Sequence, residues 1–374
     1  MKIAISTLSG ISYGGRTYFN NLIPALAKVD KYNEYHIFTH EGSDLSETIN
    51  QGNFFFHVYS SKLNSALTRL FREQLILPIE LKINKIDIMF TAKNANIILA
   101  PCKTIISIRN MEPLCYKNYQ NHWILNVFSW LRRNYTLISI KSADRIIAVS
   151  QSVKNYLEKL CPGINDKVNV IYNGNPVAEE SLNKNADGDR TPFMLSASKF
   201  VAYANQLNLI EGYAGLYEKN KELPPLWLAG GIHDKIYFEK IQKIITKRNL
   251  TDKIKILGLV PHGHLIELYS QAHAFIFPST LEACPQTLIE AMACGVPIAS
   301  SNVPPMPEIC ETAAIYFDPF DTNDIADKID SIFFDERLRE HLRKTALERS
   351  RFFDWEKTAV DLVKVFEIVH QDNP

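Results

Sequence analysis

Two glutamates, Glu282 and Glu290, are separated by seven residues in segment 278–297, which reads PSTLEACPQTLIEAMACGVP. The apolar run Ala274–Phe277 precedes them and predicts a buried strand, after which Glu282 falls in a loop. A helix is predicted to begin near Gln286 and to carry Glu290. Two carboxylates placed in this way can hold an uncharged polyol at two points, while the N–H groups at the helix N-terminus face a diphosphate. On spacing alone, two surface glutamates beside a helix start explain the pattern equally well.

Three other places carry residues that suit ligand binding just after a predicted strand. Lys199 could offer an ammonium group to a phosphate, or it could be an ordinary solvated lysine. Gly14-Gly15 would allow close approach of the backbone to phosphate or sugar, or would form a plain left-handed turn. Arg109 and Asn110 predict either a polar contact to a ligand or a capped loop. Because Gly14-Gly15 is not part of a GxGxxG motif, the sequence argues against a nicotinamide dehydrogenase.

The elements that position these residues are two series of short strands that alternate with helices. The strands predicted in the first series are Lys2–Thr7, Tyr35–Thr39, Phe54–Tyr59, Ile86–Phe90, Thr104–Ile108, Arg145–Val149 and Val168–Ile171. Its predicted helices are Thr17–Lys28, Asn64–Lys82, Asn118–Lys141 and Ser152–Leu160. The second series has strands at Phe193–Ser196, Leu226–Ala229, Ile254–Leu257, Ala274–Phe277, Pro297–Ser300 and Ile315–Phe317. This alternation predicts an α/β protein with two doubly wound, Rossmann-like parallel sheets.

The domain boundaries follow from chain length and composition. A chain of 374 residues predicts two domains of about 180 residues each. The first is expected over residues 1–178, followed by a linker over 179–192 that is rich in Asn, Asp and Gly. The second is expected over 193–351, and a last helix within 352–374 should bury one face.

The net charge of zero conceals an asymmetry between the two halves. Residues 1–178 carry 20 Lys and Arg against 12 Asp and Glu, a balance of +8, and the remaining 21 against 29 give −8. The basic half predicts an anionic partner such as a membrane surface or a phosphorylated acceptor. No nucleic-acid recognition motif accompanies the charge, so nucleic acid is not expected.

The two long helical segments of the first half, Asn64–Lys82 and Asn118–Lys141, mix apolar residues with arginines. Apolar spacing of three and four favours a buried core face. Alternatively, aromatic residues beside arginines suit the headgroup layer of an anionic membrane.

The cysteines, the apolar runs and the start of the chain indicate the cellular compartment and whether a metal is bound. Six cysteines, with no CxxC pair and no nearby histidine cluster, favour reduced thiols and no metal site. No apolar run approaches the roughly 18 residues of a membrane span. The start of the chain resembles a first strand and not a signal peptide. We therefore expect a cytoplasmic protein that could lie peripherally on the inner face of the membrane.

A series of short motifs resembles the retaining glycosyltransferases of family four, which have the GT-B fold. The resemblance runs along essentially the whole chain. Its motifs are Gly14-Gly15, Ala148-Val149-Ser150, Val170–Gly174, Leu228–Gly231, Gly258, Pro278-Ser279, the Glu-x7-Glu segment, Ala291–Pro297 and Pro307–Ile309. The resemblance implies that the first domain serves the acceptor and the second binds the nucleotide sugar. It also implies that the C-terminal helix packs back on the first domain.

The same resemblance assigns roles to the residues of the site. Glu282 would bond the transferred sugar and Glu290 the ribose hydroxyls. The turn Cys284-Pro285-Gln286-Thr287-Leu288 would lie near sugar and diphosphate, although Pro285 has no N–H to donate. Gly14, Gly15 and Gly258 would approach the substrates.

The cations of the site depart from the family pattern. Lys199 would be the first of two cations on the diphosphate, and the second position falls on Ala204, where relatives place a lysine. Arg109 and Asn110 would stand where relatives place a His-Asp pair.

The implied function is retaining transfer of a hexose-type sugar from a nucleotide-diphosphate sugar to a glycan or lipid-linked acceptor. The reaction would use no metal or cofactor and would belong to surface polysaccharide or glycoconjugate synthesis. One alternative is a sugar-nucleotide epimerase on the same fold, which the Glu-x7-Glu pattern disfavours. Another is a catalytically silent nucleotide-sugar-binding or scaffold subunit, which Ala204 keeps open.

Overall fold

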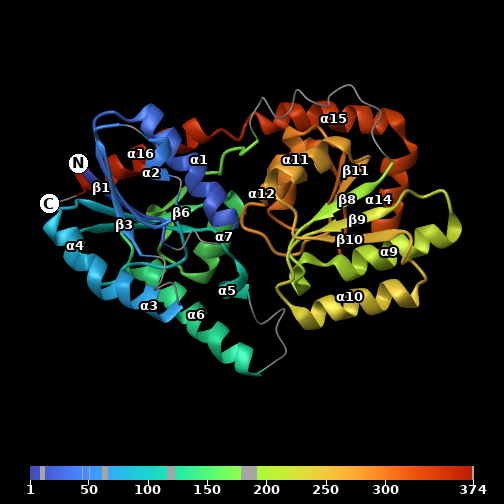
Figure 1. Ribbon diagram of the computed structural model, residues 1–374, viewed down its shortest axis with the longest axis horizontal. Coiled ribbons are helices and arrows are strands. Elements are labelled where there is room, and N and C mark those ends of the chain that lie inside the picture. The colour runs from blue at the N-terminus through green and yellow to red at the C-terminus, as the bar shows by residue number, and fades with distance from the viewer. Residues whose placement is uncertain are drawn as a thin grey trace. The chain divides into compact units, whose positions relative to one another are not determined.

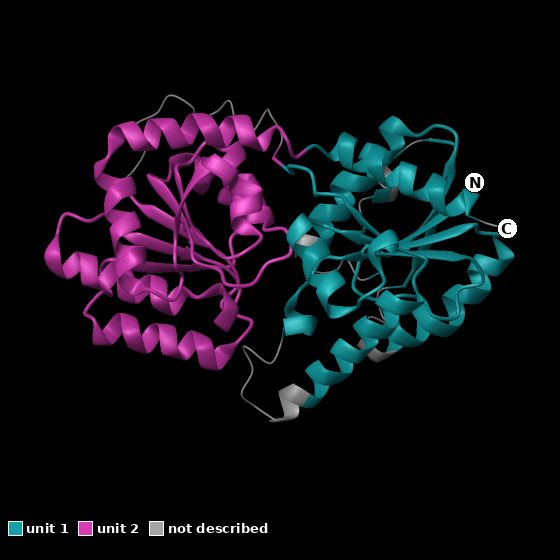
Figure 2. Ribbon diagram, turned by 180° about the vertical axis from the view of Figure 1, so that it is seen from behind, with its two compact units in different colours: residues 1–176, 354–374 teal, residues 177–353 magenta. Residues whose placement is uncertain are grey.

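The structure, a computed structural model, describes residues 1–8, 13–43, 45–49, 51–60, 66–115, 123–177 and 192–372. The chain divides into two compact units (Figure 2). Unit 1 comprises Met1–Pro176 and Asp354–Pro374, and unit 2 comprises Val177–Phe353. The C-terminal segment therefore belongs to the unit that the N-terminus begins.

Unit 1 is built on a parallel sheet of seven strands in the order β3-β2-β1-β4-β5-β6-β7 (Figure 1). The strands are β1 (Lys2–Ser6), β2 (Glu34–His40), β3 (Phe54–Tyr59), β4 (Ile88–Thr91), β5 (Lys103–Ile108), β6 (Arg145–Ala148) and β7 (Val168–Val170). All seven predicted strands are confirmed, and no strand end differs from its prediction by more than two residues. Central strands such as β1 and β4 are almost continuously buried, as expected for a parallel sheet covered on both faces.

Helices cover the two faces of this sheet. They are α1 (Tyr13–Val29), α2 (Leu45–Thr48), α3 (Ala66–Phe71), α4 (Leu77–Ile83), α5 (Glu112–Cys115), α6 (Trp123–Ser142), α7 (Gln151–Leu160) and α16 (Trp355–Gln371). Between α3 and α4 runs a π-helical turn, Arg72–Ile76, and a 3₁₀ turn, Asn165–Lys167, precedes β7.

The C-terminal helix α16 packs on α1 within the main core of unit 1. The ring of Trp355 meets that of Tyr18 edge-on at 5.4 Å. The Thr358 hydroxyl donates to the Tyr172 carbonyl at 2.8 Å. The apolar face predicted for this helix is buried, at residues Ala359, Leu362, Val365, Phe366 and Val369.

Unit 2 repeats the plan with six parallel strands in the order β10-β9-β8-β11-β12-β13. The strands are β8 (Met194–Ala197), β9 (Leu226–Ala229), β10 (Ile254–Gly258), β11 (Ala274–Phe277), β12 (Ile298–Ser301) and β13 (Ala314–Phe317). The helices are α9 (Gln206–Lys219), α10 (Lys235–Lys247), α11 (His262–Gln271), α12 (Gln286–Ala293), α13 (Met306–Cys310), α14 (Thr322–Phe334) and α15 (Glu336–Ser350), with 3₁₀ turns at Ala202–Ala204 and Glu311–Ala313. Aspartate side chains cap α10, α14 and α15, each accepting backbone N–H bonds that the helix start cannot satisfy itself.

Each sheet has one point at which the strand order reverses. In unit 1 it lies between β1 and β4, and in unit 2 between β8 and β11. Loops that leave adjacent strands on opposite faces open a crevice there, and ligands of doubly wound sheets bind outside the carboxyl ends of the strands at this point. The α/β architecture predicted from the sequence, with one doubly wound parallel sheet in each half of the chain, is thus confirmed in both units.

Two predicted helices differ from the structure, and the predicted linker lies almost entirely outside the described residues. The helix predicted to start at Thr17 begins at Tyr13, so Gly14 and Gly15 lie in its first turn and do not form a separate turn. The predicted linker lies outside the described residues except at Pro192. The segment predicted as one helix over 64–82 is helical from Ala66 to Ile83, but a π-helical turn that the prediction lacked separates α3 from α4.

Among the residues whose side chains the structure describes, the buried core face predicted for the two arginine-containing segments is wrong for most of the large apolar ones, because these are exposed. None of the described helices combines the length and apolar character needed to cross a bilayer. The six cysteines all lie among the described residues and form no disulfide.

Candidate functional site

Glu282 lies in the loop that leaves the carboxyl end of β11, next to the reversal point of unit 2. The Ser279 hydroxyl donates to Glu282 Oε1 at 3.0 Å. Burial raises the pKa of the Glu282 carboxyl to about 7, against the opposing effects of Ser279 and of the Lys199 ammonium. Near neutral pH the carboxyl can therefore both donate and accept hydrogen bonds, as recognition of a sugar hydroxyl requires.

Lys199 leaves the carboxyl end of β8, the strand that pairs with β11. The buried Gln206 amide donates to the Ser198 hydroxyl and to the Lys199 carbonyl, both at 2.9 Å. The Thr280 N–H donates to the Tyr203 carbonyl at 2.8 Å and so joins the loops after β11 and β8. Adjacent strands and these loop bonds bring together Lys199 and Glu282, which are 83 positions apart in the sequence.

Gly230 and Gly258 lie at the carboxyl ends of β9 and β10, the two strands that continue the sheet beyond β8. Gly230 has a φ of +153°, and a Cβ built there would lie 1.8 Å from the Ser198 carbonyl oxygen. Its N–H donates to the Gly258 carbonyl at 2.7 Å. Gly258 itself has a φ of +69°. The backbones after three neighbouring strands can approach this closely only because glycine occupies position 230.

Helix α12 begins at Gln286, as predicted, with Pro285 at the N-cap position. The Pro285 carbonyl accepts from the Leu288 N–H at 3.0 Å, which closes the first turn. Pro285 is buried, whereas Cys284, Gln286 and Thr287 are half-buried. The N-terminal turn of α12 follows the Glu282 loop directly, so the positive end of the helix lies beside the carboxyl end of the sheet.

Glu290, in the second turn of α12, is 4% exposed. His262 Nε2, from the first turn of α11, lies 3.1 Å from Glu290 Oε1. That hydrogen bond is the main reason that the pKa of His262 is raised above its usual value. Sequence reasoning missed His262, although its place just beyond the predicted strand Ile254–Leu257 put it at the same sheet edge.

Ala204 closes the 3₁₀ turn after β8 and is 2% exposed. Asn205 follows it in the left-handed region, with a φ of +60°, and its side-chain amide donates to the Pro319 carbonyl at 2.7 Å. Position 204, where a second cation is expected, therefore lies in a tightly fixed turn. Its side chain is a methyl group and carries no charge.

In unit 1, Arg109 and Asn110 follow β5, one strand away from the reversal point. The Asn94 side-chain carbonyl accepts from the N–H groups of both residues, at 3.0 and 3.2 Å. The Asn110 side chain accepts from the Glu112 N–H at 2.9 Å, and the Arg109 guanidinium stacks 3.5 Å from the centre of the Tyr18 ring. This geometry fits the capped-loop explanation, and sequence reasoning missed Asn94, which organises the loop.

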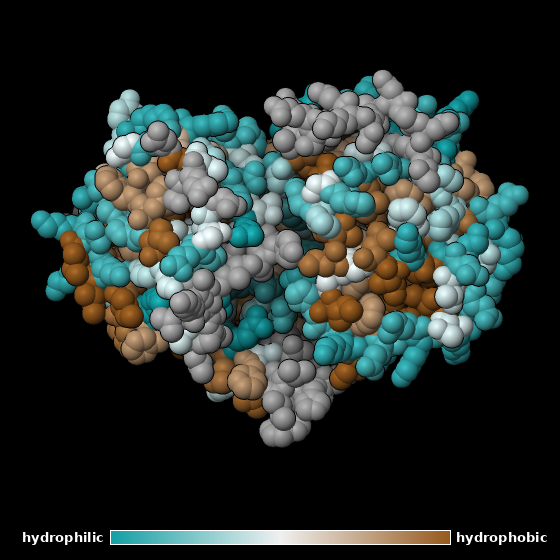
Figure 3. All heavy atoms as spheres, viewed as in Figure 1, coloured by the Kyte–Doolittle hydropathy of each residue, from teal (hydrophilic) through white to brown (hydrophobic). Residues whose placement is uncertain are grey.

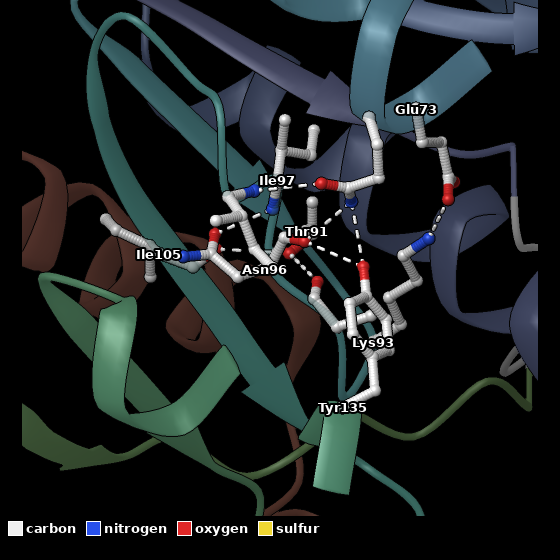
Figure 4. A network of polar contacts seen from close by, with 10 residues as sticks. Glu73, Thr91, Lys93, Asn96, Ile97, Ile105 and Tyr135 are labelled. Carbon is white, nitrogen blue, oxygen red and sulfur yellow. Dashed lines mark hydrogen bonds and ion pairs between the residues drawn. The ribbon is translucent and has the colours of Figure 1, made fainter. Parts of the chain in front are cut away.

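A second feature missed from the sequence is a buried polar network beside the end of β4 (Figure 4). The Lys93 ammonium pairs with Glu73, which is 3% exposed and lies in the π-helical turn. The hydroxyl of Tyr135 and the side chain of Asn96 belong to the same network. The pairing compensates a charge that burial alone would make costly.

Within the part of the chain that the structure describes, no group of three or more His, Cys, Asp or Glu side chains could hold a metal ion. The polar groups gathered at the β8–β11 edge are instead two carboxyls, one ammonium, one imidazole and a helix N-terminus. Such a set suits a ligand with several hydroxyls and a diphosphate.

Comparison with known proteins agrees with this geometry. Residues 13–178 match the model of the family described as Glycosyltransferase Family 4, and residues 177–349 match that of Glycosyl transferases group 1. Among sequence relatives, the O-antigen chain mannosyltransferase B of Escherichia coli is 29% identical over 167 residues, which are 44% of this chain and 43% of that protein. An uncharacterized glycosyltransferase of Methanocaldococcus jannaschii is 28% identical over 228 residues, 60% of each chain. These matches therefore span about half the length of the relatives.

Solved structures of similar fold cover nearly the whole chain. The Anabaena protein HepE, in complex with UDP and glucose, superposes with a TM-score of 0.70 at 17% identity and covers 98% of this chain and 99% of its own. WaaG, a glycosyltransferase involved in lipopolysaccharide biosynthesis, gives a TM-score of 0.71 at 12% identity over 97% of this chain and 99% of its own. At these identities the likeness shows the fold.

Proposed function

The chain belongs to the glycosyl transferases group 1, and we propose that it moves a hexose from a nucleotide-diphosphate sugar to a glycan or lipid-linked acceptor with retention of anomeric configuration. The observation that carries the proposal is the meeting of Glu282, Lys199 and the α12 N-terminus at the β8–β11 reversal point. Retention is supported by the Glu-x7-Glu resemblance.

The donor would be held by residues of unit 2. Glu290 accepts hydrogen bonds from the ribose hydroxyls, and His262 keeps its carboxylate oriented. Lys199 and the N–H groups of the first α12 turn face the diphosphate, where cations and helix N-termini stabilise negative charge. The near-neutral pKa of Glu282 suits a hydrogen bond to a hydroxyl of the transferred sugar.

In the reaction, the acceptor oxygen forms a bond to the anomeric carbon while the bond from that carbon to the donor phosphate oxygen breaks. The nucleoside diphosphate leaves with the electron pair, and the proton of the acceptor hydroxyl passes to a phosphate oxygen. The protein contributes positioning and stabilisation of the charge that grows on the leaving group. No group of the enzyme becomes covalently attached in this scheme, and no step needs a resident cofactor.

The acceptor is proposed only as a class of molecule, a glycan or a lipid-linked acceptor. The E. coli relative is named as an O-antigen chain mannosyltransferase, which supports a role in synthesis of a surface polysaccharide. A silent nucleotide-sugar-binding subunit remains the second candidate because the buried Ala204 stands where a second cation was expected.

The proposal is tested by thermal shift with UDP, GDP and ADP, followed by transfer or donor-hydrolysis assays with the sugar forms of whichever nucleotide stabilises. A ligand at 100 times its Kd raises the free energy of unfolding by about 2.7 kcal/mol, a shift that is readily measured.

Glu290→Gln should weaken nucleotide binding by about tenfold or more, because a hydrogen bond to a charged group contributes about 1.5–3 kcal/mol. Glu239→Gln, an exposed glutamate on α10 outside the family motifs, serves as a control. Nucleotide binding without any turnover would favour the silent subunit, and equal affinity of Glu290→Gln and the parent would contradict the ribose assignment.

A further inference from the structure

Two helical segments of unit 1 expose large apolar side chains along their outer faces. We call this surface the apolar face. Its exposed residues are Leu70, Phe71, Leu75, Ile76, Ile79 and Ile83 along α3 to α4, Ile98 and Leu99 after β4, and Val127, Phe128, Trp130, Leu131 and Ile138 on α6. Figure 3 shows apolar residues gathered over α4 and again where α6 runs. Gatherings of large exposed apolar side chains mark interaction sites.

Helix α6 is turned the opposite way from an ordinary surface helix. Its buried side includes Ser129, Thr136 and Ser139, each at most 5% exposed. Its outer side presents Phe128 and Trp130, which are 63% and 54% exposed. A helix of a soluble domain normally buries its apolar stripe and solvates its polar side. The outer side of α6 therefore matches an apolar environment better than water.

The two segments are joined into one surface by the network at the end of β4 (Figure 4). The Gln74 side-chain amide donates to the Asn96 carbonyl at 2.9 Å and to the Tyr135 hydroxyl at 2.8 Å. The Gln74 side-chain carbonyl accepts from the Ile98 N–H at 3.0 Å. Gln74 lies in the π-helical turn and Tyr135 on α6, so these bonds fix both segments and the Ile98–Leu99 loop together.

The charges around the apolar face are mainly positive. Its exposed cations are Lys82, Lys85, Arg132 and Lys141. The carboxylates of the same segments are occupied, because Glu73 is buried against Lys93 and Glu80 accepts from the Tyr59 hydroxyl. Glu112, on the neighbouring α5, pairs with Arg132 at 3.4 Å.

We infer that the apolar face docks on the headgroup layer of an anionic membrane. Aromatic and branched side chains would enter the boundary between headgroups and acyl chains, while the long lysine and arginine side chains reach the lipid phosphates. A second copy of this chain fits less well, since pairing the face with itself would bring like charges together. The inference goes beyond the proposed transfer reaction and does not depend on it.

The test measures binding of the full chain to vesicles of phosphatidylcholine alone and of phosphatidylcholine mixed with phosphatidylglycerol, at low and high salt. The apolar variant is Ile79→Gln/Ile83→Gln/Phe128→Gln/Trp130→Gln. Its control replaces two equally exposed apolar residues of unit 2, Ile236 and Phe320, by Gln. The charge variant is Lys82→Gln/Lys85→Gln/Lys141→Gln, and its control is Lys243→Gln/Lys247→Gln, on the exposed side of α10.

We expect the parent and both controls to bind anionic vesicles, with weaker binding at high salt. Both face variants should lower the partition coefficient at least tenfold. Their circular dichroism spectra and melting temperatures without ligand should match those of the parent, which shows that the variants are folded whether or not the donor site binds a nucleotide.

Three outcomes would overturn the inference. They are no binding of the parent to anionic vesicles, equal binding of the apolar variant and its control, and binding that is equal on neutral vesicles and insensitive to salt. A parent that sediments as a dimer which the apolar variant abolishes would assign the face to a second copy instead.

Discussion

His262 Nε2 lies 3.1 Å from Glu290 Oε1, so the carboxylate that we assign to the ribose is held from a neighbouring helix. The imidazole is half-exposed and the carboxylate is almost fully buried. Because His262 contacts only Oε1, it can orient the Glu290 side chain and leave the second carboxylate oxygen available to a ligand.

His262→Phe should weaken nucleotide binding about threefold to tenfold, because Glu290 loses its orienting hydrogen bond.

The same variant should also change how stability depends on pH. The pKa of His262 is raised in the folded protein. Its contribution to the free energy of unfolding is therefore complete below its unfolded pKa of about 6.5 and is lost as pH rises through the higher folded value. Urea unfolding should show the variant less stable than the parent at pH 6, with a smaller difference at pH 9. His264→Phe, on an exposed histidine of the same helix, is the control. A pH-independent difference would argue against the ion pair.

Glu282→Gln should stabilise the protein in a pH-dependent way. The Glu282 pKa is raised from 4.5 to about 7, chiefly by burial, so the folded state holds this proton more tightly than the unfolded state. Parental stability should therefore fall as pH rises from about 4.5 to 7, whereas the glutamine variant lacks this contribution. Above pH 7.5 the variant should be more stable by about 1–3 kcal/mol, and near pH 4 the two should agree. Denaturant titrations over this range measure the difference, and parallel profiles would show that the carboxyl titrates normally.

Gly230→Ala should be strongly destabilising, whereas Gly231→Ala should be tolerated. A Cβ at position 230 would lie 1.8 Å from the Ser198 carbonyl oxygen, and its φ of +153° is unfavourable for alanine. At position 231 the nearest atom, His233 Nε2, is 3.5 Å away. We expect a loss of about 3 kcal/mol or more for the first and under about 1 kcal/mol for the second. Similar melting temperatures for both variants would mean that the β8 and β9 ends are not packed as described.

Ala204→Lys should raise kcat about tenfold or more while changing nucleotide Kd little. An ammonium at this position would face charge that grows as the sugar–phosphate bond breaks, and such an interaction acts on the transition state. Because Ala204 is 2% exposed, the longer side chain should also lower stability by about 1–3 kcal/mol. Kinetics and Kd are therefore measured at a temperature where circular dichroism shows the variant folded. An unchanged or lower kcat under that condition would reject the missing-cation hypothesis.

The sequence by itself determined the architecture and the main chemical groups of the site. Each predicted strand was a short apolar run between turn residues, and every one is present, because fully buried parallel strands leave that local signature. The Glu-x7-Glu spacing likewise determined that one carboxylate precedes α12 and the other lies on it, since both depend on local helix geometry.

Other features depended on residues that are distant in the sequence, and only the tertiary structure decided them. Nothing local to His262 indicates Glu290, and nothing local to Lys93 indicates Glu73; strand order and helix packing bring these partners together. Helical periodicity on α6 identified an apolar side but not its direction, because a 3.6-residue repeat is the same whether that side faces the sheet or the surroundings. Packing placed Ser129, Thr136 and Ser139 inside and left Phe128 and Trp130 exposed.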